Sequence, residues 1–157
     1  MKKVAISLVL MIGLIIGYTA PSQAFLDKTR FAAHLGIAYF VFHHWVQNPY
    51  RQGAFGQGAP HRTATMVKAG AAMLFAVHEV HVSQKIAANS KDPLLQRLSG
   101  GLTTMAASFV AIGTGLKHGN LNPTDVQSLG SQTDTISGEA AQDGAQIRDV
   151  PVAVPGT

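Results

Sequence analysis

Three stretches between residues 27 and 118 repeat their apolar side chains with the period of an α-helix. Within each stretch the apolar positions follow one another at steps of three and four, which places them on one side of a helix. No stretch sustains the period-two alternation that a half-buried strand requires. The pattern predicts an all-α fold, a small bundle of three main helices around one hydrophobic core.

Helix-start and helix-stop signals bound these three elements. The first (about 27–47) is expected to end before Pro49, because the residue preceding a proline avoids helical geometry. The second is expected to run from Pro60 or Thr63 to Asn89. The third begins at Asp92, an N-cap acid followed by proline at the first helical position, and Gly119 follows its last turn as a C-cap residue. The expected core is Phe31, Leu35, Phe42, Trp45, Met73, Val77, Leu98, Met105, Phe109 and Ile112.

Residues 1–24 have the layout of a cleaved Sec signal peptide. Two lysines precede an apolar stretch at 4–20, and small residues stand at positions 22 and 24. Cleavage is expected between Ala24 and Phe25, which places the mature chain in the periplasm or the extracellular medium, with membrane association left open. The alternative is an uncleaved anchor, although the 17 residues at 4–20 fall short of a full span.

Charge and composition divide the mature chain at residue 118. Residues 25–118 hold nine Lys and Arg against three acids, a net charge of +6, whereas residues 119–157 hold one Arg against five acids, a net charge of −4. The second segment has no aromatic residue and is predicted to be a polar, acidic, largely disordered tail, with one short helix near 123–129. The basic domain favours an anionic partner, either lipid headgroups or wall polymer. The alternatives are a tail that folds back on it, or ordinary solvated charge.

Histidines on the predicted helices are the candidate metal ligands. His78 and His81 project from one side of the second helix at i and i+3, and His34 borders the apolar side of the first. Neutral imidazole binds transition metals and haem iron, so these three predict a haem or divalent-metal site as the alternative to a chain without cofactor. A histidine beside a core more often bonds a carbonyl or a neighbouring side chain. Glu79 and Ser83 are expected on the opposite, solvent side of the second helix, and His81 on its apolar side.

Residues 48–62 form a loop rich in glycine that leads into the second helix. Arg51, His61 and Arg62, together with the backbone amides at the helix start, are candidates for holding a phosphate or a carboxylate. The alternative interpretation is a structural connection between antiparallel helices, with its aromatic side chains packed against the bundle.

The chain lacks a complete set of residues for a known type of catalysis. Export and the lack of a basic run disfavour nucleic-acid binding. We therefore expect an exported protein with a structural or binding role in the envelope or medium, rather than an enzyme. Two alternatives are a haem- or metal-binding helical protein and an integral membrane helical hairpin. The hairpin is considered because residues 98–116 carry no formal charge and small residues are dense.

Overall fold

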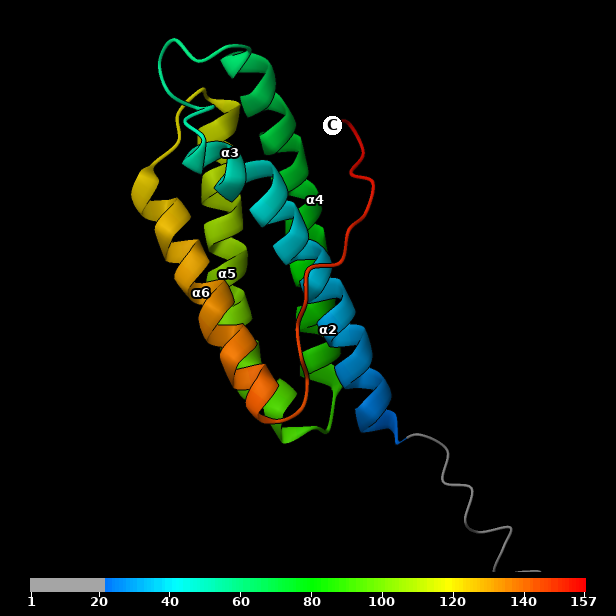
Figure 1. The fold of residues 1–157 in the computed structure, drawn as a ribbon. Coiled ribbons are helices and arrows are strands. Elements are labelled where there is room, and N and C mark those ends of the chain that lie inside the picture. The colour runs from blue at the N-terminus through cyan, green and yellow to red at the C-terminus, as the bar shows by residue number, and fades with distance from the viewer. Residues whose placement is uncertain (1–21) are drawn as a thin grey trace, which may run out of the picture.

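The computed structural model describes residues 22–157, so the predicted signal peptide lies almost entirely outside the described residues. Within this range the chain is helical and contains no strand, which confirms the all-α prediction (Figure 1). The first long helix continues through a π-helical turn into one further helical turn. The elements are α2 (Gln23–Phe42), η1 (His43–Gln47), α3 (Asn48–Arg51), α4 (Arg62–Asn89), α5 (Pro93–Lys117) and α6 (Pro123–Gln142).

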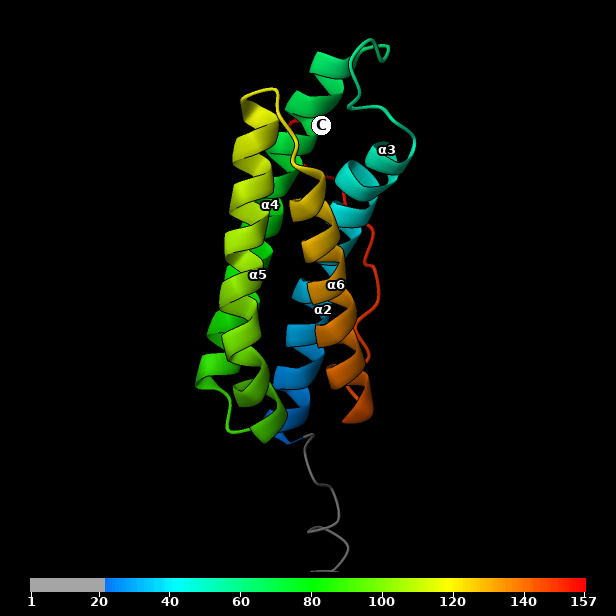
Figure 2. The same cartoon turned by 90° about the vertical axis from the view of Figure 1, so that its left-hand side faces the viewer.

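The four long helices form two layers, α4 with α5 and α2 with α6 (Figure 2). α4 packs against both α5 and α2, α5 packs against α6, and η1 closes the remaining side by contacting α6. The core fills the space between the layers, and Phe42 meets Phe109 edge-on there, with ring centroids 6.2 Å apart. The predicted core residues are buried except for Trp45 and Val77, which are only partly buried. Each buried side chain of this size contributes about 1.5–3 kcal/mol before entropy is counted.

Small residues bring α4 and α5 close together. A Cβ atom added to Gly113 would lie 3.2 Å from the Cβ of Met73. One added to Gly70 would lie 3.7 Å from the carbonyl oxygen of Gly113. Because a larger residue at Gly113 would press on Met73, the small residues set the spacing of this layer.

The count of three helices and the disordered tail are corrected by α6, which is a fourth helix of the bundle. Asn122 caps it by accepting a 3.0 Å hydrogen bond from the Thr124 amide, and Pro123 follows at the first helical position. A helix that packs on a neighbour needs only one narrow apolar side. The polar composition of residues 119–157 as a whole concealed that side in the sequence. The side chains buried on that side are Val126, Leu129, Thr133, Ile136 and Ala140.

The first helix does not end before Pro49, so that predicted boundary is also wrong. The chain passes through η1, in which the Asn48 amide bonds the carbonyl oxygen of His43, five residues earlier. A proline inside a regular helix leaves one carbonyl without its donor and crowds it. The wide π turn relieves that crowding, and Pro49 lies in the first turn of α3, where proline is tolerated.

The last residues, 145–157, form what we call the C-terminal strap. The strap runs along the outside of α2 and ends beside α4 (Figure 1). The Val150 amide donates a 3.0 Å hydrogen bond to the carbonyl oxygen of Gly36, and Val154 is buried. A Cβ atom on Gly36 would overlap the carbonyl oxygen of Arg148, so the strap fits against α2 only because glycine stands there.

Replacing Gly36 by alanine tests whether the strap packs on α2. We expect Gly36→Ala to lower the free energy of unfolding by about 1–3 kcal/mol, because the new methyl group pushes the strap off the helix. Gly138→Ala is the matched control, since open space surrounds Gly138 on exposed α6. The control should raise the free energy of unfolding by about 0.5–1 kcal/mol, because alanine has a higher helix propensity than glycine. Urea denaturation measures both variants, and equal gains would show that the strap does not pack on α2.

Candidate functional site

A part-buried contact between a histidine and a glutamate joins α2 to α4. The Nδ1 atom of His34 lies 2.6 Å from Oε2 of Glu79, and the glutamate is only 7% exposed. His34 itself is partly open to solvent. A buried carboxylate without a partner is costly, so His34 gives Glu79 the partner that its burial demands.

The predicted orientation of α4 is wrong over its second half. Glu79 and Ser83 face the bundle, whereas His81 is exposed. Alanine is the most frequent residue on the buried side of α4, and a pattern based on large apolar residues does not reveal such a side. Those buried alanines are Ala69, Ala72, Ala76 and Ala87.

The buried Ser83 does not complete a catalytic set with this pair. Its hydroxyl donates a 3.1 Å hydrogen bond to the backbone carbonyl oxygen of Glu79. A nucleophilic serine needs its hydroxyl on the imidazole that removes the proton. Here the hydroxyl bonds its own helix, and the histidine bonds the carboxylate. The arrangement therefore fastens two helices together.

The three candidate metal ligands do not form one group in the structure. His34 contacts Glu79, while His78 and His81 are exposed on α4. Across residues 22–157, the structure shows no group of three or more His, Asp or Glu side chains that could hold a metal ion. The hypothetical meeting of His34 with His81 is replaced by the contact of His34 with Glu79.

Arg62, one of the candidate anion-binding residues, bonds backbone carbonyl oxygens, as expected if residues 48–62 form a structural connection. Arg62 donates from Nε to the carbonyl oxygen of Phe55 at 2.9 Å, and from Nη2 to that of Gly119 at 2.8 Å. Phe55 is buried against the bundle, and His61 is exposed in the left-handed conformation with φ 56°. Arg62 therefore ties the loop to the end of α5. Arg51 is exposed and lines a separate groove of about 370 Å³ between α3 and α6.

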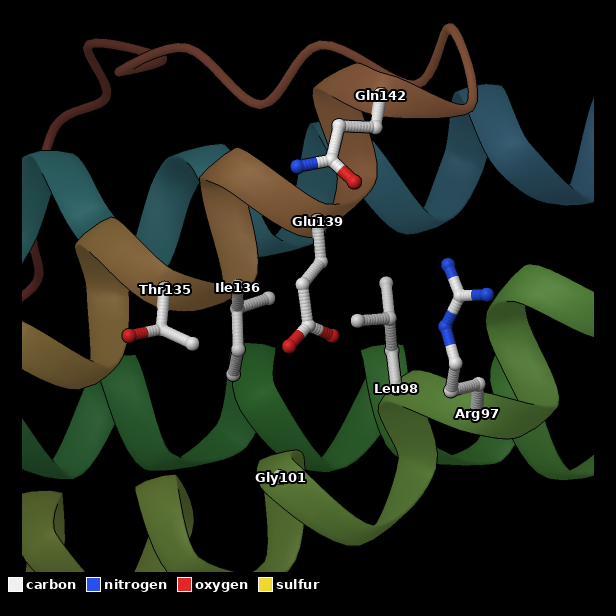
Figure 3. Close-up of a pocket in the computed structure, with 7 residues that line it drawn as sticks. All are labelled: Arg97, Leu98, Gly101, Thr135, Ile136, Glu139 and Gln142. Carbon is white, nitrogen blue, oxygen red and sulfur yellow. The ribbon is translucent and has the colours of Figure 1, made fainter.

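A larger groove of about 490 Å³ lies between α5 and α6 (Figure 3). Arg97 of α5 and Glu139 of α6 bring opposite charges to its walls, and Leu98, Gly101 and Ile136 line it between them. Arg97 is already paired, with its Nη2 atom 2.7 Å from Oδ2 of Asp143. Mixed charge and an engaged arginine give this groove no preference for one sign of ligand.

The π-helical turn holds the strap through a histidine. The Nδ1 atom of His43 lies 2.8 Å from Oδ2 of Asp149, which stands in the strap. Turns of this kind frequently occur at functional positions. Here the turn presents His43 outward to an acidic residue that sequence reasoning did not connect with it.

Tyr39 lies one turn before His43 and is buried. Among the described residues its hydroxyl has no hydrogen-bond partner. Burial raises the pKa of this hydroxyl well above the ordinary value of 10.0; the nearby Ser137 hydroxyl opposes the shift, and the Asp134 charge adds to it. The tyrosine therefore stays neutral at physiological pH and acts as a core residue.

Formal charges separate between the two layers. Residues 62–118 carry six Lys and Arg and two acids, and both acids are buried and paired, Glu79 with His34 and Asp92 with Lys28 at 3.1 Å. The five acids of residues 119–157 lie on α6, at its end, or in the strap. The acidic segment does fold back, as one alternative predicted, through the contacts of Arg97 with Asp143 and of His43 with Asp149. These contacts leave most of the outer side of α4 and α5 exposed, although the end of the strap comes close to Ala71 of α4 at Gly156.

That mostly exposed side, which we call the α4–α5 outer face, is made of two parallel stripes at helical spacing. From α4 it includes Val67, Leu74, His78, His81 and Lys85, all exposed. From α5 it includes Thr103, Ala107, Val110, Thr114 and Lys117, also exposed. Within these two fully described helices the outer face contains no acid.

The position of the outer face follows from contacts on the other sides of both helices. Leu74 lies about 140° round α4 from Glu79, which faces α2. Val110 lies about 200° round α5 from Ser108, which bonds Gln132 of α6. Both apolar residues therefore point away from the other layer.

No protein-family model, curated protein or solved structure matches this chain. The sequence left open a membrane hairpin, but in the described part of the chain no helix has the length and apolar character to cross a bilayer. Function must be argued from surfaces and sites, since fold alone does not define it.

Removing His34 tests its pairing with Glu79. We expect His34→Ala to lower the free energy of unfolding by about 1–3 kcal/mol, because the carboxylate stays buried without a partner. The partial exposure of His34 favours the lower end of that range.

The double variant His34→Leu/Glu79→Leu should recover most of this loss, because both polar groups are gone. His81→Ala is the control, an exposed site expected to change stability by less than about 0.5 kcal/mol. Urea denaturation measures all three. A double variant as unstable as His34→Ala would show that packing, and not the buried charge, explains the loss.

Proposed function

We propose that this chain is an exported binding protein of the cell envelope that docks on an anionic surface, either lipid headgroups or wall polymer. The observation that carries the proposal is the separation of charge between the two layers of the bundle. Every cation of α4 and α5 except Arg62 is exposed, whereas the two acids of residues 62–118 are buried and paired. An anionic surface would attract this layer and repel α6, which gives the protein one favoured orientation.

Lys85 and Lys117 are the cations placed to make the contact. They stand toward opposite ends of the outer face, on different helices. Asp27 and Arg30 share a groove of about 440 Å³ with Lys85, so these two neighbours offset each other. Each lysine near an anionic surface contributes about 1 kcal/mol at physiological salt.

Neutralising these two lysines should weaken binding. We expect Lys85→Gln/Lys117→Gln to reduce binding to anionic vesicles or to isolated wall polymer by roughly 30-fold, the equivalent of about 2 kcal/mol. Binding of the unmodified protein should fall as salt rises from 0.1 to 1 M, because the Debye length shortens from about 10 to about 3 Å. Sedimentation at two salt concentrations measures both effects.

The matched control is Arg51→Gln/Arg148→Gln, which removes the same charge from exposed residues of α3 and the strap. Its binding should stay within about threefold of the unmodified protein, since long-range attraction alone is largely screened. Equal losses in both double variants would show that net charge, and not this layer, governs binding. Absence of salt-dependent binding to either material would contradict the proposed function.

A further inference from the structure

We propose that the α4–α5 outer face docks on an anionic lipid bilayer, with Val67, Leu74 and Val110 entering the boundary between headgroups and acyl chains. This inference rests on the proposed function and names which anionic surface is bound. The chemistry it requires is a membrane surface that is anionic at the headgroups and apolar just beneath them.

The three apolar side chains are exposed to an unusual degree. Val67 is 61% exposed, Leu74 is 68% exposed and Val110 is 48% exposed. The other large apolar side chains exposed among residues 22–157 are Phe25 and Leu26, at the start of α2. A cluster of exposed aliphatic side chains on a charged protein marks an interaction surface more than a scatter of single ones does.

Close packing places these three side chains around one patch. Gly70 contacts Gly113 and the backbone amide of Lys117, so the middle of α4 lies beside the second half of α5. Val67 and Leu74 flank Gly70 along α4, about 10 Å apart at 1.5 Å per residue. Val110 is one turn before Gly113 on the neighbouring helix. The patch is therefore wide enough to lie flat on a surface.

Lysines border the patch in a way that suits a bilayer. Lys117 lies at the Val67 end, and Lys85 lies toward the other end, where Gln84 donates a 2.9 Å hydrogen bond to Thr103. Long lysine side chains extend to headgroups while aliphatic neighbours go deeper. A wall polymer would use the lysines but has no apolar layer to receive Leu74. The combination of cations with aliphatic side chains therefore favours lipid.

The first experiment removes the aliphatic side chains while keeping the lysines. We expect Leu74→Gln/Val110→Gln to bind vesicles of phosphatidylglycerol and phosphatidylcholine about tenfold more weakly than the unmodified protein. Glutamine suits exposed helix positions, so folding should be unchanged. Binding to isolated wall polymer should be the same for both proteins. Leu26→Gln is the control, because it removes an exposed leucine from the start of α2.

The possible outcomes separate this inference from the proposed function. If Leu74→Gln/Val110→Gln binds vesicles as well as the unmodified protein, and salt still weakens the binding of both proteins, docking by charge is supported and insertion of the apolar side chains is wrong. If Leu26→Gln loses as much affinity for vesicles as the double variant, the protein docks through the start of α2 and the assignment of the outer face is wrong. If the unmodified protein binds neither vesicles nor polymer, the proposed function itself fails.

A second experiment reports position directly and uses the lack of cysteine in the chain. Leu74→Cys and Ser131→Cys each accept one environment-sensitive fluorophore, on α4 and on the exposed side of α6. We expect a blue shift at position 74, and not at position 131, when phosphatidylglycerol vesicles are added. Equal shifts at both positions would overturn the proposal. A blue shift at position 74 that higher protein concentration produces without vesicles would overturn the proposal and assign the face to a second copy of the chain.

Discussion

The close contact between α4 and α5 through Gly70 and Gly113 is the constraint on which the rest of the structure depends. Because these residues are small, the two backbones approach until Met73 meets the α5 backbone. The side of α4 that faces the bundle is accordingly rich in alanine, and Glu79 and Ser83 are buried among those alanines. Large aliphatic residues of the same helix are left outside this contact, where Val67 and Leu74 are exposed.

The second layer is held by different means. α2 and α6 are bridged by large side chains such as Tyr39 and by the turn η1, and the strap crosses outside α2 at Gly36. This layer collects the acids of the C-terminal segment. The two sides of one small bundle thus differ in both charge and exposed apolar area. Such asymmetry is what a protein that docks in one orientation requires.

The sequence predicts much of the fold where local signals are strong. Asp92 and Pro93 start α5 where expected, and the Asp92 side chain accepts from the amides of Leu94 and Leu95. α6 was missed because its buried stripe is narrow and the surrounding composition is polar. The end of the first helix was predicted wrongly at Pro49, because residue types do not indicate the π turn that precedes it.

The candidate site was harder to predict because it depends on how helices are rotated. Glu79 is the only acid within α4, and sequence pattern placed it in solvent, although alanines at steps of three and four ran through the same side. The contact of His43 with Asp149 joins residues more than one hundred positions apart. The separation of charge was visible as a basic domain with an acidic segment. Only the fold shows that the acidic segment packs on α2 and α5 and leaves most of the outer face exposed.

The most direct test of membrane docking through α4 and α5 is a residue-by-residue map of the contact by nuclear magnetic resonance. The isotope-labelled protein, residues 25–157, is titrated with phosphatidylglycerol bicelles that carry a paramagnetic lipid, and with uncharged bicelles as the reference. The account predicts that the anionic bicelles attenuate amide signals of residues 67–85 and 103–117, and leave α6 unchanged. Attenuation centred on α6, the strap or the start of α2 would contradict it.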